Sequence, residues 1–314
     1  MSFFHNVGAV GAQVLILFLM MGFGFFAAKM RWINETGSHQ MTAVLLNLVT
    51  PCIIIQSFLT LEHSPDTIAN LGLAVGFSAA AHLIGFGIGW LAFRRGDPQK
   101  RSLYRFAVPF TNCGFIGIPV TRAVLGDKYV VWVTIFIAVF HFFTWTVGIR
   151  FFDKGGKPSL KKAVINPGVI GIVIGLALYL FKVTGDNLPN ILHAPIKYMY
   201  DINTPLAMII TGYFLATVSL LPRKGDGAMW AAILLRLLAI PAIMLGAAWA
   251  LGLRNEVTLA LMVPIAAPIS TMAILFPTQL GGDVELGARM TPWSNIASAL
   301  TMPLIIALSQ VVLR

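Results

Sequence analysis

The chain has 314 residues, of which 57% are hydrophobic and only 11% are charged, and its mean hydropathy is +0.82. A soluble domain carries about 25% charged residues, so the composition excludes an ordinary soluble protein and indicates a chain embedded in a membrane. The net charge of +10 does not indicate nucleic-acid binding, because the Lys and Arg residues lie in short loops and form no basic face with interleaved aromatic residues.

Ten apolar segments follow one another along the chain, and each is long enough for a spanning helix, which needs about 20 residues. The predicted helices cover residues 7–28, 40–60, 68–93, 103–125, 129–151, 164–183, 196–220, 228–251, 256–280 and 290–312. The first segment has no basic region before it and is long enough to span, so we interpret it as a helix and not as a cleaved signal peptide. The sequence therefore predicts an all-α polytopic membrane protein with ten transmembrane helices.

The basic residues are distributed unequally between the loops on the two sides of the predicted membrane. Fifteen Lys and Arg residues lie in the loops after odd-numbered helices, against six on the other side. Because cytoplasmic loops carry the excess of basic residues, this difference places both termini outside the cytoplasm. The longest basic loop, residues 153–162, falls between the fifth and sixth helices.

Two proline landmarks recur along the chain. Pro51 and Pro205 each follow a Thr in an apolar segment, and Pro109 and Pro264 each follow a Val; the two pairs are 154 and 155 residues apart. This shared offset predicts two five-helix repeats, residues 1–152 and 163–314. Since five crossings reverse the direction of the chain, the second repeat is predicted to be inverted. Inverted repeats are typical of transporters whose site lies where broken helices of the two halves meet.

The fourth predicted helix contains the most irregular stretch. Pro109 and Pro119 each lack a backbone donor and oppose a regular helix, while Gly114 between them permits close approach of another group. Thr111 and Asn112 place polar side chains at about mid-membrane depth. Irregular backbone at that depth is tolerated only against protein or beside a water-lined cavity, so we expect an interrupted helix next to a cavity.

The ninth predicted helix has a similar stretch with two prolines and two hydroxyl side chains. If the two breaks cross, half-helix N-termini point their positive ends into a shared pocket that suits a carboxylate. The alternative is that the prolines only kink packed helices, since Pro and Gly are common in membrane helices. The predicted substrate-binding residues are Thr111, Asn112, Gly114, Pro119, Pro264, Pro268, Ser270, Thr271, Arg236 and His141.

The second and seventh predicted helices carry polar residues next to their prolines. Asn47 and Thr50 precede Pro51, and Asn203 lies two residues before Pro205. These side chains either bond the carbonyls that proline leaves free or line the substrate path.

Few ionisable residues lie within the apolar segments, where such residues are functional candidates by default. Arg236 either extends to the cytoplasmic interface or is buried as a counter-ion for an anionic substrate. His141 and His82 are candidates for proton relay, although a lone His on an apolar face is more often merely hydrogen-bonded. We expect Cys52 and Cys113 to be packing residues, because they form no metal-binding pattern.

One stretch of the fourth helix resembles a known family. Residues 111–119, Thr-Asn-Cys-Gly-Phe-Ile-Gly-Ile-Pro, resemble the asparagine-glycine-proline signature of the auxin efflux carrier family, which includes plant auxin exporters and bacterial permeases. Residues 166–175 look like the start of its sixth helix, and residues 204–208 and 236–241 are similar to its seventh and eighth helices. The resemblance spans essentially the whole chain.

The resemblance implies ten helices in an inverted five-plus-five repeat, with helices 4 and 9 crossing at their breaks. It implies a scaffold of helices 1, 2, 6 and 7 (about 7–60 and 164–220) and a mobile unit of helices 3–5 and 8–10 (about 68–151 and 228–312), which moves in an elevator-like manner. By motif, Asn112 would bind a substrate carboxylate and Pro119 would shape the crossing, while Pro264 and Pro268 are both open for the matching part in helix 9. A homodimer is suggested by the resemblance alone.

We therefore predict a multi-pass secondary carrier of the bacterial cytoplasmic membrane for a small organic anion, such as a mono- or dicarboxylate or an auxin-like acid. No catalysis, cofactor or bound metal is expected, and coupling to H⁺ or Na⁺ is open. One alternative is a sodium-coupled bile-acid-type symporter, which needs cation ligands behind the crossing. A membrane enzyme would show acidic DDxxD, paired Asp, Ser/His or HExxH patterns, and none appears in the sequence. A channel would conduct far faster than a carrier.

Overall fold

A computed structural model describes residues 3–61, 63, 66–152, 167–217, 226–280 and 282–313. Within these ranges the regular secondary structure is helical, apart from one isolated antiparallel bridge between Thr111 and Ile269. The prediction of an all-α protein is therefore confirmed. The predicted junction loop, residues 153–162, lies outside the described residues.

Every predicted segment overlaps a helix or a run of consecutive helices. In the first half the elements are α1 (Phe3–Lys29), α2 (Glu35–Val44), η1 (Leu45–Val49), α3 (Thr50–Leu59), α4 (Thr67–Ala92), α5 (Pro98–Ala107), η2 (Cys113–Gly117), α6 (Ile118–Val124), η3 (Asp127–Tyr129), α7 (Val130–Thr146) and η4 (Gly148–Phe151). In the second half they are α9 (Pro167–Leu180), α10 (Asn190–Thr217), α11 (Gly227–Leu234), η5 (Leu235–Ala239), α12 (Ile240–Ala250), α13 (Glu256–Ala266), α14 (Met272–Leu280) and α15 (Val284–Val312).

Five helices or helix runs in the described residues are long and apolar enough to cross a membrane: Glu35–Leu59, Thr67–Ala92, Asp127–Thr146, Gly227–Ala250 and Val284–Val312. Shorter apolar helices include Cys113–Val124 and Glu256–Ala266, because the fourth and ninth predicted helices are each interrupted. Many large apolar side chains on the outer helices are exposed, as expected for a surface that faces lipid.

The described residues contain three π-helical turns: η1 and η5 interrupt α-helical runs, and η2 begins the half-helix that continues as α6. Each ends two residues before a proline, namely Pro51, Pro119 and Pro241. A proline ring clashes with the carbonyl one turn earlier and offers no N–H to it, so the turn before it widens by one residue. Widened turns of this kind occur frequently at functional sites because they redirect side chains.

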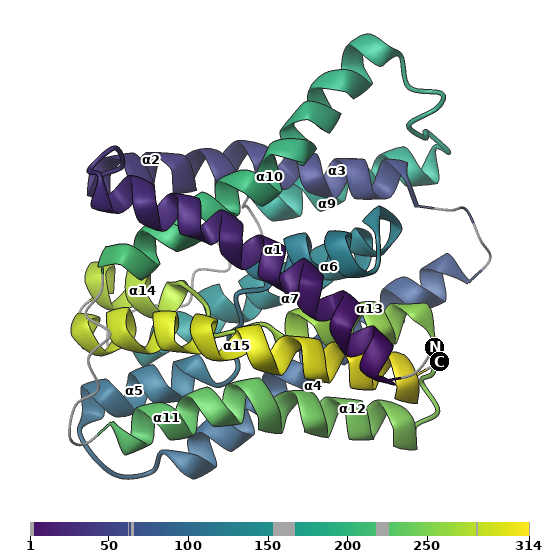
Figure 1. The fold of residues 1–314 in the computed structure, drawn as a ribbon. Helices are drawn as coiled ribbons and strands as arrows, with labels where there is room; N and C mark the ends of the chain where they lie inside the picture. The colour runs from purple at the N-terminus through teal and green to yellow at the C-terminus, as the bar shows by residue number, and fades with distance from the viewer. Residues whose placement is uncertain are drawn as a thin grey trace.

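Helices α2, α3, α9 and α10 lie together on one side of the molecule, and α4, α5, α11 and α12 lie on the other; α1 joins the first group through α10 and also runs diagonally across to α15 (Figure 1). In the first group the backbones of α1 and α10 touch, because a Cβ atom on Gly24 would clash with the backbone of Ile209, and one on Gly212 with the backbone of Met21. Likewise, a Cβ on Gly171 of α9 would lie 3.0 Å from Pro51 Cα of α3. Small residues at such contacts allow membrane helices to pack tightly.

The start of α1 and the end of α15 lie at the same end of the molecule (Figure 1). This placement agrees with an even number of crossings between them.

Candidate functional site

The interruptions in the fourth and ninth predicted helices lie against each other, and we call them the paired breaks. The first break, residues 108–112, separates α5 from η2, and the second, residues 267–271, separates α13 from α14. The Asn112 N–H donates to the Pro268 carbonyl at 2.7 Å, and the Ser270 N–H donates to the Phe110 carbonyl at 3.0 Å. The two non-helical strands thus satisfy part of each other's backbone in the interior of the protein, where an unpaired group is costly.

The four prolines predicted to shape this region occupy different positions. Pro109 and Pro268 lie within the paired breaks, whereas Pro264 lies in the last turn of α13 and Pro119 in the first turn of α6. Of the two candidates left open in the ninth helix, Pro268 therefore lies at the break itself. Pro264 instead packs against the end of η2, since a Cβ on Gly117 would lie 3.5 Å from Pro264 Cβ.

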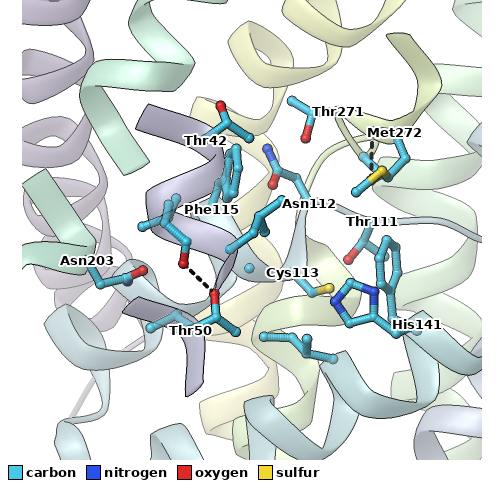
Figure 2. Close-up of a pocket in the computed structure, with 17 residues that line it drawn as sticks. Thr42, Thr50, Thr111, Asn112, Cys113, Phe115, His141, Asn203, Thr271 and Met272 are labelled. Carbon is cyan, nitrogen blue, oxygen red and sulfur yellow. Dashed lines mark hydrogen bonds between the residues drawn. The ribbon is translucent and has the colours of Figure 1, made fainter. Parts of the chain in front are cut away.

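A cavity of about 50 Å³ lies between the paired breaks and residues of α2, η1, α3, α7 and α10 (Figure 2). At about 10–15 Å³ per water in this measure, it holds a few water molecules, which is the scale of a small solute's head group. The polar residues in its wall are Thr42, Thr50, Thr111, Asn112, His141, Asn203, Ser270 and Thr271. The described wall contains no Asp, Glu, Lys or Arg side chain.

Several polar atoms in the cavity wall are buried and have no hydrogen-bond partner. Both side-chain amide nitrogens, Asn112 Nδ2 and Asn203 Nδ2, are unpaired, and so is His141 Nδ1. Thr111 Oγ1 is also unpaired, apart from the weak thiol of Cys113 beside it. Buried polar groups are normally satisfied, so these four atoms in the wall of one cavity are available for hydrogen bonds to a molecule that enters it.

Other hydroxyl groups in the same wall are already satisfied. Thr42 Oγ1 donates to the Ser38 carbonyl at 2.8 Å, and Thr50 Oγ1 donates to the Leu45 carbonyl at 2.9 Å. These two side chains give the cavity a polar lining, but their donors are not free for a ligand.

The starts of two half-helices also face the cavity. Cys113 and Gly114 begin η2, and Thr271 and Met272 stand at the start of α14; all four line the cavity. The first N–H groups of a helix have no partner within it and carry the positive end of its dipole. A Cβ on Gly114 would meet nothing within 4 Å, so the glycine keeps this part of the wall open. Ser270 Oγ accepts a bond from Met272 N–H at 3.2 Å and so caps α14.

Arg236 is only 1% exposed and does not extend to an interface, so the first of the two interpretations of this residue does not hold. Its guanidinium donates to the Val108 carbonyl at 3.0 Å and also to the Ile265 carbonyl. It is not part of the cavity wall. Arg236, Pro119, Pro264 and Pro268 are thus the predicted site residues that lie outside this wall, while Thr111, Asn112, Gly114, His141, Ser270 and Thr271 line it.

His82, the other histidine considered for proton relay, is buried among aromatic side chains. Its Nδ1 lies 2.8 Å from the Ser78 carbonyl, and its ring stacks on Phe143 and lies close to Phe136. It is outside the described cavity wall, so its environment fits a packing role.

Sequence analysis missed part of the cavity wall. Thr42 received no assignment, and neither did the apolar residues Phe115, Phe140 and Met272. A signal was present for Thr42, because Thr42, Leu46 and Thr50 are spaced four residues apart and so share one helix face. Apolar wall residues give no comparable signal in a chain that is apolar almost throughout.

The fold and the site define a membrane protein of the transporter class. It has long apolar helices, interrupted helices paired at their breaks, and a small polar cavity beside them. Within the described residues, no group of three or more side chains is arranged to hold a metal ion.

The family comparison agrees. The sequence model of the family described as "Membrane transport protein" matches the chain twice, over residues 9–163 and 156–306. The chain belongs to this auxin efflux carrier-type family of membrane transport proteins. It is also 24% identical over 297 residues to an "Uncharacterized transporter" of Methanothermobacter thermautotrophicus, covering 93% of this chain and 95% of that one. Both comparisons indicate a transporter and not an enzyme.

Proposed function

We propose that this protein is a secondary carrier for a small organic anion, a mono- or dicarboxylate or an auxin-like acid, in a bacterial cytoplasmic membrane. The observation that carries the proposal is the group of unpaired donors around the cavity. Asn112 Nδ2 and Asn203 Nδ2 are donors only, and they point to a ligand that offers acceptors. A carboxylate is the smallest common group with several acceptor sites.

The lack of charged side chains in the described wall fits transport better than tight storage. A carrier must release its substrate, and neutral amides and half-helix ends bind an anion without the strong fixed ion pair that Arg would form. Hydrogen bonds to a charged group contribute about 1.5–3 kcal/mol each. A few of these replace the hydration shell of one carboxylate.

The proposed mechanism is an elevator-like movement of one helix group against the other. The backbone contacts of α1 with α10 and of α9 with α3 favour a rigid scaffold. The paired breaks belong to the other group and form part of the cavity wall, while Thr42, Thr50 and Asn203 contribute the scaffold side. A cavity shared in this way opens to one side or the other when the groups slide. The family matches over both halves and the shared proline offset support an inverted repeat with crossed helices 4 and 9.

Binding by purified protein tests the proposal directly. A ligand that binds the folded state raises the melting temperature by mass action, so a panel of mono- and dicarboxylates and auxin-like acids should contain members that raise it. Asn112→Ala removes one or two bonds to the charged group and should weaken the affinity for such a ligand by about 10- to 100-fold.

Asn47→Ala is the matched control, because the Asn47 side chain is exposed and already donates to the Ala43 carbonyl at 2.8 Å. It should leave the affinity unchanged. If Asn112→Ala binds every stabilising anion as tightly as the unaltered protein, the assignment of the site is wrong.

A further inference from the structure

We propose that Arg236 is a tethered cation that fills a cage of backbone carbonyls on the far side of the paired breaks, in the place where a soluble coupling cation would otherwise bind. Its Nη1 donates to the carbonyls of Val108 at 3.0 Å and Pro109 at 3.4 Å, and its Nη2 donates to the carbonyl of Ile265. One side chain therefore joins both interrupted helices.

The carbonyls in this cage are the ones that interrupted helices leave without partners. Val108 follows the last residue of α5, and Ile265 lies in the last turn of α13. The last carbonyls of a helix have no N–H ahead of them, and Pro109 offers no N–H of its own. Three such oxygens around one guanidinium form a site for a cation, because carbonyl oxygens are hard ligands of the kind that coordinate ions inside transporters.

The charge of Arg236 is balanced by the backbone and not by an acid. None of the ion pairs found within the described residues includes Arg236, although Arg289, the other strongly buried Arg, pairs with Asp226. Each helix C-terminus is equivalent to about −0.5 of an elementary charge. The ends of α5 and α13 therefore carry about one negative charge together, which a single guanidinium neutralises.

The partial charges of the helix ends on the cavity side can be added in the same way, and their sum indicates the charge of the ligand. This step rests on the proposed function. The starts of η2 and α14 contribute about +0.5 each, and the described cavity wall contains no charged side chain. The cavity is thus left with about one uncompensated positive charge. It should bind a substrate through one ionised carboxylate, with no sodium ion bound at the crossing.

Arg236 lies in the widened turn η5, which ends two residues before Pro241, and this turn directs its side chain toward the cage. Arg suits this position better than Lys, because its planar fork offers several donors in fixed directions and can reach oxygens on two segments at once.

Removal of the Arg236 side chain tests whether the surrounding carbonyls bind a cation. Arg236→Ala should lower the melting temperature of the purified protein, and guanidinium chloride at low millimolar concentration should restore several degrees of it by entering the vacated cage. The same salt should shift neither the unaltered protein nor Arg105→Ala. Arg105 lies on α5, whose end supplies part of the cage, but it donates to a single carbonyl, that of Phe93 at 2.9 Å, at a half-buried position. Equal shifts in all three proteins, or none in Arg236→Ala, would overturn the proposal.

Two further variants keep the test decisive if Arg236→Ala does not fold. Arg236→Lys retains the charge and Arg236→Gln does not, so Arg236→Lys should be the more stable of the two and only Arg236→Gln should respond to guanidinium. A glutamine variant as stable as the lysine variant would contradict the role of the charge.

A separate experiment tests whether the unaltered protein binds sodium. Its melting temperature should be the same in sodium chloride and in choline chloride at equal ionic strength, with and without a stabilising anion. Stabilisation that depends on sodium would show that a soluble cation still binds. The melting experiments without anion need no substrate. A negative result in them would contradict the cage proposal but not the carrier proposal. If no anion is found to bind, the carrier proposal is contradicted while the melting experiments still test the cage.

Discussion

The two sides of the paired breaks differ in how the unpaired backbone groups of the helix ends find partners. On one side, the carbonyl ends of α5 and α13 are bonded by Arg236, and α4 packs closely behind Pro109. On the other side, the starts of η2 and α14 face a cavity in which amide donors have no partners. The broken helix pair thus has a side completed by the protein and a side that, in the proposed function, is completed by the substrate. We call these the closed side and the cavity side.

The largest effect should come from reversing the electrostatics of the cavity side. Asn112→Asp keeps the shape of the side chain but replaces a donor by a negative charge beside the proposed carboxylate. Like charges brought together at a binding site cost several kcal/mol, so the affinity for the anion should fall by more than about 100-fold at neutral pH. Isothermal titration measures this loss, and a melting temperature close to that of the unaltered protein shows that the fold persists. Undiminished anion binding by Asn112→Asp would place the ligand elsewhere.

The next effect concerns the closed side and should appear in stability. A Cβ atom on Gly85 of α4 would lie 2.7 Å from Pro109 Cα, so Gly85→Ala must displace the first break. Overpacking of this kind costs about 1–3 kcal/mol, and the melting temperature should fall by several degrees. Gly87→Ala on the same helix is the control, since a Cβ there meets nothing within 4 Å and Ala favours the helix by about 1 kcal/mol. If the two variants have the same melting temperature, the close packing behind Pro109 contributes nothing measurable to the stability of the protein.

The smallest effect should separate free hydroxyls from satisfied ones within the cavity wall. Thr111→Val removes an unpaired donor and should weaken anion binding by about tenfold. Thr42→Val removes a hydroxyl that already donates to the Ser38 carbonyl, so it should change the affinity about twofold or less. Affinities from the same titration check both variants. A larger loss in Thr42→Val than in Thr111→Val would contradict the division of the wall into free and occupied donors.

Much of this organisation was accessible from the sequence, for physical reasons. Apolar segments of spanning length are self-evident in a chain with so few charged residues, and every predicted segment has a helical counterpart. The interruption near Pro109, Thr111 and Asn112 was predictable because proline and polar residues at mid-membrane depth need a special environment. The inverted repeat and the division into scaffold and mobile unit remain predictions.

The closed side was harder to predict. The role of Arg236 depends on carbonyls of residues 108, 109 and 265, and backbone acceptors are the same in every residue, so the sequence does not mark them. A choice between Pro264 and Pro268 likewise needed the three-dimensional pairing. The regular offset of 155 residues aligns Pro264 with Pro109, whereas the Pro268 carbonyl bonds Asn112 in the opposite break.

The widened turns that precede Pro51, Pro119 and Pro241 carry a consequence for how this protein tolerates change. Each turn accommodates one residue more than a regular helix, and one residue corresponds to a rotation of about 100° around the helix axis. Loss of a single codon from η5 would therefore convert the widened turn into an ordinary α turn and leave the helix on either side in register, whereas the same loss from the regular part of α12 would rotate one end by more than a quarter of a revolution. Deletions of one residue should therefore be tolerated better in these three short stretches than in the regular turns beside them.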